Sequence, residues 1–313
     1  MSDSKELRGR LSSVTGRVNA GKLHRKTLGH HFSSFEHGEV DHTQLLSSQF
    51  GYLLKTQDQS DVTFIVEEKL FEAHRIILSG RCEYFRALLY GGMREATNCE
   101  QIELHDTPAR AFDYLLNYIY KGTISLKHIE GKDVIDMLVL ANKYSLLALE
   151  SAITGYLKNI IGLENVTDIY DVSALFNMSD LETACLAFMD HNAAQVVASD
   201  GFLRLSEQSV LSIVSRKSFC AREFVIFQGV SNWVKNNDVE DVAKLLKHVR
   251  LPLISMDELL HAVRDSELFS AEQILNAITA KTESRVNELP HRGYLGKTQR
   301  FLFCKSSIKH PAK

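Results

Sequence analysis

Residues 61–90 read DVTFIVEEKLFEAHRIILSGRCEYFRALLY, and this stretch decides the fold class. Residues 62–66 are a run of β-branched and aromatic residues, which is typical of a buried strand. The polar residues after this run predict a tight turn into a return strand at Leu70-Phe71, so we expect a hairpin. Two short helices are expected over 73–90, divided near Ser79-Gly80. A hairpin followed at once by helices indicates an α+β domain.

Upstream of the hairpin, apolar residues recur at helical spacing after Asp41 and Thr43, either of which is a suitable helix cap. This helix, over 45–54, has more apolar surface than one buried face needs. Surplus apolar area usually marks an interface. The apolar residues are Leu46, Phe50, Leu53 and Leu54.

Downstream, residues 102–104 alternate as a third strand, and a helix is expected to start at Asp106 with Pro108 just inside. Gly122 is expected to stop this helix, and residues 123–125 to form a short strand. Residues 133–144 are apolar almost all round, and a helix of this kind is normally sandwiched inside a domain.

After Gly162 the strand signals vanish and helical patterns follow one another with short connections. Short connections between consecutive helices imply antiparallel hairpins, and therefore a helical bundle or array. The expected helices span 165–176, 179–192, 193–200, 206–215, 221–237, 239–248, 255–264 and 270–281.

The 313 residues carry a net charge of −3, which conceals an acidic body between basic ends. Residues 41–290 contain 23 basic and 35 acidic residues, a net charge of −12. This argues against nucleic-acid binding by the folded part, because phosphate contacts need a basic face. No apolar run approaches the ~20 residues that span a bilayer. The polar N-terminus lacks the apolar core of a secretory signal.

These patterns predict four segments. Residues 1–40 are expected to be a disordered arm, 41–160 the α+β domain, 161–283 the helical domain, and 284–313 a basic, disordered tail. Five histidines at positions 24, 30, 31, 37 and 42 lack accompanying ligands at metal-binding spacing, so no metal site is predicted.

Chemistry-bearing motifs are missing from the sequence. Phosphate-binding loops, zinc-protease motifs and nucleophile elbows are absent. Cys82 and His74 are near one another in sequence, but no third orienting group accompanies them, and a structural role for His74 is favoured. The five cysteines are odd in number and never form CxxC, which fits a reducing compartment. We expect a cytoplasmic protein that is not an enzyme and has no cofactor.

The segments 61–64, 71–75 and 79–88 together resemble the BTB/POZ signature, with a strand, the FEAHR corner and a Tyr84-Phe85 pair at set spacings. Residues 118–122, YIYKG, are similar to a later segment of the family. The region 164–265 resembles the BACK module, including GFLRLS at 201–206. The resemblance therefore implies an α+β BTB/POZ domain followed by an all-α BACK helical domain.

Domains of this type form homodimers through the first helix and the helices around the FEAHR corner. The resemblance places that interface on seven residues. Asp61 and Arg75 match a charged pair that the family places near the dimer axis; the alternative is a strand-capping acid and a solvated arginine. The seven are Leu46, Phe50, Leu53, Leu54, Asp61, Arg75 and Leu78.

The resemblance also implies a second protein partner, cullin-3. Members that bind cullin carry an apolar-x-Glu motif after the third helix, and Met93-Arg94-Glu95 matches it. Met93 would supply an adaptable apolar contact and Glu95 a charge-assisted hydrogen bond. Leu88, Leu89 and Tyr90 would form the adjoining surface. The alternative is an exposed turn without a partner.

The expected function is that of a homodimeric substrate adaptor for a cullin-3 RING ubiquitin ligase, with an unknown substrate. The alternative is a dimeric BTB scaffold without cullin binding. One branch of the family continues into discoidin-like domains after the BACK module, so this chain resembles a short form, which is expected either to dimerise and dock without recruiting a substrate or to compete with the longer form. The same resemblance leads us to expect roles in the nervous system and behaviour.

Overall fold

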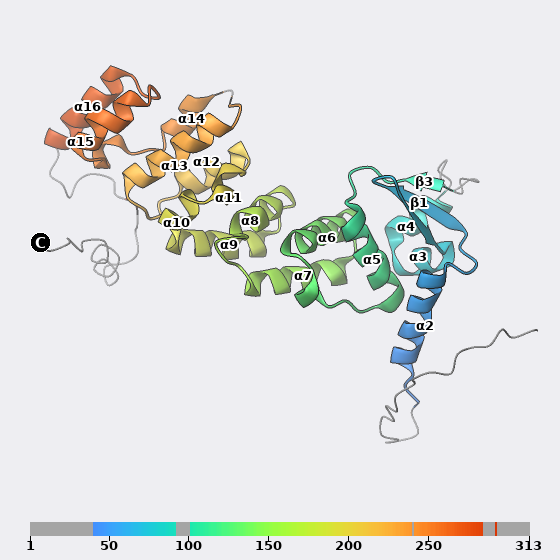
Figure 1. Ribbon diagram of the computed structural model, residues 1–313. Coiled ribbons are helices and arrows are strands. Elements are labelled where there is room, and N and C mark those ends of the chain that lie inside the picture. The colour runs from blue at the N-terminus through green and yellow to red at the C-terminus, as the bar shows by residue number, and fades with distance from the viewer. Residues whose placement is uncertain (1–39, 92–100, 240, 284–291, 293–313) are drawn as a thin grey trace, which may run out of the picture. The chain divides into compact units, whose positions relative to one another are not determined.

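The computed structural model describes residues 40–91, 101–239, 241–283 and 292 (Figure 1). The chain divides into two compact units, residues 1–43 and 44–313. Almost all of the first unit lies outside the described residues, so the fold below is that of the second. Helix α2, Thr43–Thr56, begins at the boundary, where the Asp41 carboxylate accepts a hydrogen bond of 2.8 Å from the Thr43 amide.

A three-stranded sheet with order β2-β1-β3 forms the β part of the first domain (Figure 1). Strands β1, Val62–Val66, and β2, Lys69–Ala73, pair antiparallel, with Phe64 opposite Phe71. Strand β3, Gln101–Glu103, runs parallel to β1 on its other side. The predicted hairpin and third strand are confirmed. Both turn residues between β1 and β2 adopt positive φ, as a tight two-residue hairpin requires.

Two short helices follow the hairpin, α3, Arg75–Arg81, and α4, Glu83–Tyr90. Their division lies at Cys82, which has extended φ and ψ, and not at Ser79-Gly80. Gly91 caps α4 with φ of −80°, so its role is not the left-handed turn that glycine usually supplies there.

Helix α5, Ala109–Lys121, begins one residue after Pro108. The cap comes from a distant residue, because the Glu67 carboxylate accepts the Ala109 amide at 3.0 Å. The expectation that Asp106 caps this helix is therefore wrong. Gly122 ends the helix with φ of 70°, as predicted. Residues 123–125 are not a strand; they lead into a 3₁₀ turn, Leu126–His128.

The core of the first domain lies between the sheet and the helices. Phe64 packs against Phe85 and Phe112, with ring centroids 5.5 and 5.7 Å apart. Helix α6, Gly131–Lys143, contacts α5, α7 and α8, and these neighbours explain why the helix is apolar on almost all sides. Helix α7, Leu147–Asn159, completes this part of the chain.

The rest of the described chain is helical, as predicted, and no strand occurs among the described residues after 160. One α-helix was missed, because α11 begins at Asp200, the last residue of the helix expected over 193–200. The elements are α8 Val166–Leu175, α9 Ser179–His191, α10 Ala193–Val197, α11 Asp200–Leu203, α12 Glu207–Ser215, α13 Glu223–Asn236, α14 Val242–Leu246, η3 Leu251–Leu253, α15 Met256–Glu258, the π-helical η4 Leu259–Val263, and α16 Ala271–Glu283.

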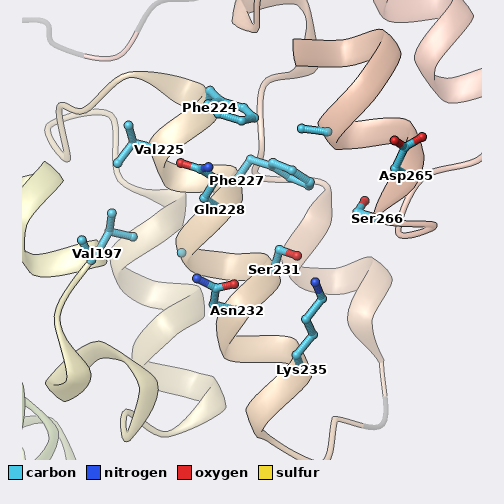
Figure 2. A pocket seen from close by; sticks show the side chains of 13 residues that line it. Val197, Phe224, Val225, Phe227, Gln228, Ser231, Asn232, Lys235, Asp265 and Ser266 are labelled. Carbon is cyan, nitrogen blue, oxygen red and sulfur yellow. The ribbon is translucent and has the colours of Figure 1, made fainter.

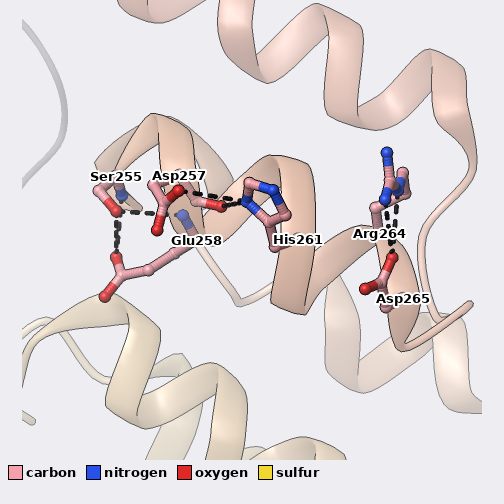
Figure 3. Close-up of polar contacts among 6 residues, drawn as sticks. All are labelled: Ser255, Asp257, Glu258, His261, Arg264 and Asp265. Atoms are coloured by element: carbon pink, nitrogen blue, oxygen red, sulfur yellow. Dashed lines mark hydrogen bonds and ion pairs between the residues drawn. The ribbon is translucent and has the colours of Figure 1, made fainter.

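A capping box starts the α15–η4 segment (Figure 3). The Ser255 hydroxyl accepts the Glu258 amide at 3.3 Å, and the Glu258 carboxylate accepts the Ser255 amide at 3.1 Å. The two bonds satisfy donors that a helix start leaves unpaired. Within the described part of the chain, no helix is long and apolar enough to cross a membrane.

Candidate protein-interaction surface

Helix α2 packs on the domain with one side only. Phe50 and Leu54 are half-buried and contact the core, and the Ser47 hydroxyl donates to the Lys121 carbonyl at 2.7 Å. Gly51 lies on the same side, where a Cβ atom would overlap the side chain of Lys121. These contacts fix the position of the helix, yet none of its 14 residues is fully buried.

The other side of α2 is apolar and open. Leu45 and Tyr52, seven residues apart, lie on one line along the helix, and Leu46 is beside them. Leu45 is 44% exposed, Leu46 is 54% exposed and Tyr52 is 66% exposed. The polar residues Gln44, Ser48 and Lys55 form a stripe that borders Leu45 and Tyr52. We call Leu45, Leu46 and Tyr52 the α2 apolar face.

Helix α3 contributes a different residue from the one predicted. Leu78 is fully buried in the domain core, so it has no surface to offer a partner. Ile76, two residues earlier, is 73% exposed. On a helix, residues two apart point in different directions. The FEAHR corner pointed to α3, but the sequence does not say which side of this seven-residue helix is covered.

Asp61 and Arg75 join the start of β1 to the start of α3. The Asp61 carboxylate accepts the backbone amide of Arg75 at 2.7 Å, so Asp61 satisfies a donor at the N-terminus of α3. The Arg75 guanidinium donates to the carbonyls of Asp61 and Leu89, each at 3.2 Å. Arg75 therefore holds the last turn of α4 against the beginning of α3.

The predicted cullin surface is only partly within the described residues. Leu89 is buried at 1% exposure, Leu88 is half-buried, and Tyr90 is 56% exposed. Tyr90 is thus the open residue of the three, and Leu89 belongs to the core. Met93 and Glu95 lie outside the described residues.

His74 and Cys82 are each committed to structural contacts. Nε2 of His74 lies 2.8 Å from the carbonyl of Asp58, which can only accept, so Nε2 carries a proton. In the neutral ring, Nδ1 then accepts from the Tyr120 hydroxyl at 2.8 Å. The Cys82 thiol lies 3.4 Å from the Tyr144 carbonyl, and burial raises its pKa. A raised pKa disfavours the thiolate that nucleophilic catalysis needs.

Comparison with known families assigns both halves of the chain. A profile of the BTB/POZ domain matches residues 50–161, and one of the BACK domain, "BTB And C-terminal Kelch", matches residues 166–264. The chain belongs to the BTB–BACK family. The α2 apolar face and Ile76 lie on the BTB side of this division, although Leu45 and Leu46 precede the matched range.

Three relatives carry the name BTB/POZ domain-containing protein 9. The rat protein is 48% identical over 258 residues, the human protein 47% over the same length, and the Drosophila melanogaster protein 41% over 256 residues. Each alignment covers 82% of this chain. The chain spans 42% of the length of the rat and human proteins and 35% of the fly protein.

The BACK domain has a hollow of about 460 Å³ beside α13 (Figure 2). Phe224 and Phe227 supply apolar wall, whereas Asn232, Lys235 and Asp265 bring polar groups toward it (Figure 2). The π-helical η4 contributes Ala262, and π-turns often occur at functional sites. The mixed lining is suited to a polypeptide segment.

The described residues hold little that resembles a catalytic centre. They contain no group of three or more His, Cys, Asp or Glu side chains placed to hold a metal ion. Burial raises the pKa of Cys185 to about 12, and this thiol lies in the core. Of the predicted histidine group, only His42 is described.

Proposed function

We propose that this BTB–BACK protein is a homodimeric substrate adaptor for a cullin-3 RING ubiquitin ligase. The observation that carries the proposal is the α2 apolar face, which the protomer leaves open on a helix whose position is otherwise fixed. Membership of the family supports it, because BTB–BACK proteins are generally cullin-3 adaptors. The acidic body of the chain is consistent with a protein partner and not with a nucleic acid.

The exposed apolar residues of α2 support the proposal that the protein forms a dimer. Leu45, Leu46 and Tyr52 are exposed within about two helical turns, around the polar Gln49, and exposed apolar patches on single chains usually mark interfaces. A second copy offers the same patch, so a two-fold axis beside α2 pairs apolar surface with apolar surface. We assign Leu46 and Tyr52 to the centre of this contact, with Leu45, Leu53 and Ile76 around them.

The cullin contact is proposed at the C-terminal end of α4 and the residues that follow. Tyr90 offers exposed aromatic area, and tyrosine is enriched among residues that dominate binding energy. The Arg75 bond to the Leu89 carbonyl holds this end of the helix in place. Met93 and Glu95 supply the sequence motif. We propose that Leu88 also contacts cullin-3 beside Tyr90.

The substrate contact is proposed on the BACK domain, at the hollow beside α13. Its polar residues permit specific hydrogen bonds, and its two phenylalanines permit burial of an apolar side chain. The class of substrate is a protein segment.

Titration calorimetry of the full chain with the N-terminal region of cullin-3 tests the adaptor proposal. The test variant is Met93→Ala/Glu95→Ala. The matched control is Glu83→Ala/Arg86→Ala, which removes an exposed ion pair of 2.7 Å from α4. Exposed pairs contribute little, so the control should bind like the wild type. Light scattering of each protein reports the oligomeric state.

Binding by the wild type and the control, with at least tenfold weaker binding by the test variant, is the expected result. A wild-type dimer that does not bind cullin-3 would refute the adaptor role and leave a dimeric scaffold. A wild-type monomer at micromolar concentration would refute the role assigned to the α2 apolar face.

A further inference from the structure

A single arginine from outside the BACK match lies buried inside the BACK domain. Arg292 follows α16, and its guanidinium reaches residues that are 44 to 78 positions earlier in the chain. Its side chain is 3% exposed, and the Glu223 side chain that pairs with it is 2% exposed. Ion pairs of this degree of burial are unusual, because removing two charges from water is costly unless both are fully bonded.

The guanidinium is fully bonded. Nε donates to one carboxylate oxygen of Glu223 at 3.0 Å, and Nη2 donates to the other at 3.0 Å. Nη2 also donates to the His248 carbonyl at 2.8 Å. Nη1 donates to the carbonyls of Val214 and Arg216, the latter at 3.0 Å. These contacts use all five donors that an arginine side chain has.

The arrangement selects arginine over lysine. The paired bonds to Glu223 require two parallel N–H groups in one plane, which only a guanidinium supplies. An ammonium has three donors and would leave acceptors of the site unpaired. We call Glu223 with the carbonyls of Val214, Arg216 and His248 the guanidinium socket.

The guanidinium socket carries the negative charge of the Glu223 carboxylate, so the BACK domain needs a cation at this place. Glu223 is the first residue of α13, where the helix dipole favours a carboxylate, and it also accepts the Arg250 amide at 2.9 Å. These partners orient the carboxylate, and the charge of Arg250 also acts on it, but the paired guanidinium bonds come from Arg292. Without Arg292, Glu223 would be a buried charge without its guanidinium counterion, which is strongly unfavourable.

The socket and its occupant have separate origins. Glu223 and the three carbonyl acceptors of the socket lie within the matched BACK segment, residues 166–264, whereas Arg292 lies beyond it. The domain thus forms the acceptor site, and the chain after α16 supplies the arginine.

We propose that the guanidinium socket is a binding site for an arginine side chain, and that Arg292 is its intramolecular ligand. Occupied by Arg292, the socket holds this residue on the BACK domain. Vacated, it accepts a guanidinium from another molecule, so an arginine-containing polypeptide competes with Arg292 for the same carboxylate. This proposal does not depend on cullin binding.

Thermal unfolding of the full-length Arg292→Ala variant with propylguanidinium tests the site. Propylguanidinium has the chemistry of the deleted side chain. We expect the substitution to lower the melting temperature by on the order of 10 °C. We expect millimolar propylguanidinium to restore most of this loss with saturation, and to leave the wild type unchanged, because its socket is filled.

Three controls separate the socket from general effects. Propylammonium matches the charge without the planar donors, and propylurea matches the shape without the charge; neither should restore stability. The variant Glu223→Gln/Arg292→Ala removes the carboxylate and should not respond to propylguanidinium. A melting temperature of Arg292→Ala equal to that of the wild type, or equal rescue by propylammonium, would overturn the proposal.

Arg292→Lys provides a test if Arg292→Ala does not fold. It keeps the charge and most of the volume but offers three donors, so its melting temperature should lie well below that of the wild type. Wild-type stability in Arg292→Lys would show that the socket is not specific for guanidinium, and would refute the assignment.

Discussion

Helices α2 and α13 have the same length, 14 residues, and both carry large apolar side chains, but they differ in how many of their residues are buried. No residue of α2 is buried, whereas seven residues of α13 are. Helix α13 meets α10, α11, α14 and η3, and Trp233 donates from its indole nitrogen to the Leu205 carbonyl at 3.0 Å. Helix α2 rests on the BTB domain along one side.

The difference distinguishes a helix that its own chain covers from one whose apolar residues the protomer leaves exposed. The stability of α13 comes from neighbours within the same chain, including the carboxylate of its first residue, Glu223, which is paired with Arg292. The exposed side of α2 has apolar area that the protomer does not cover. Substitutions on α13 should therefore affect folding, and substitutions on the α2 apolar face should affect association.

The largest effect is expected from Trp233→Ala. It removes a side chain that is 2% exposed and leaves the Leu205 carbonyl without its donor. We expect a loss of about 3–5 kcal/mol in the free energy of unfolding, measured by denaturant titration. Asn232→Ala, on the exposed side of the same helix, should change it by less than about 0.5 kcal/mol. Equal effects at the two positions would show that the buried side of α13 contributes no more to stability than its exposed side.

Next in size is the effect of Leu46→Asp on self-association. A charge in the centre of an apolar interface should weaken the dimer at least tenfold, or about 1.4 kcal/mol, in sedimentation equilibrium. Gln44→Asp introduces the same charge at an exposed position of α2 that is not three or four residues from any residue of the α2 apolar face, so it should leave the dimer intact. The helical content of both variants should match the wild type. Equal dissociation by both would show that the α2 apolar face is not the interface.

A smaller effect is expected from Asp61→Ala, which removes the acceptor for the Arg75 amide at the start of α3. Loss of a side-chain acceptor at a helix start costs about 1 kcal/mol, observable as a lower urea midpoint. Asp58→Ala is the matched control, because Asp58 contacts His74 through its backbone carbonyl. A loss in the control as large as that in Asp61→Ala would show that general charge removal is responsible.

The smallest effect concerns pH. Burial, and then the charges of Lys247, Arg292 and Arg250, lower the pKa of His248 from its ordinary value of 6.5. The unfolded chain therefore binds more protons than the folded one just below that value. The stability that neutral His248 provides is complete above pH 6.5 and decreases as the pH falls below it. His248→Gln should reduce this slope in melting curves between pH 7 and 5, and an unchanged slope would contradict the role of His248.

The BTB hairpin was predictable because its signals are local. A run of β-branched residues, a polar turn and a return strand lie within twelve residues, and each fixes the backbone through its own side chains and turn geometry. The helices of the BACK domain were predictable for the same reason, since apolar spacing of three and four residues determines which side of a helix is buried.

The site was predicted less completely. The sequence indicated α2 and the FEAHR corner, but it did not show that Leu78 and Leu89 are buried or that Ile76 is exposed, because an apolar side chain looks the same in a core and at an interface. Nor did it show that Glu67 caps α5 from 42 residues away.

By itself, the sequence determined the order of the elements, the change from an α+β domain to a helical one, the acidic body and the family signature, because these depend on residues near one another in the chain. Only the tertiary structure decided which apolar residues of α2 and α3 remain open, and that Arg292 pairs with Glu223. Burial and ion pairing depend on residues that folding brings together, and no periodic signal connects these two across their separation of 69 residues.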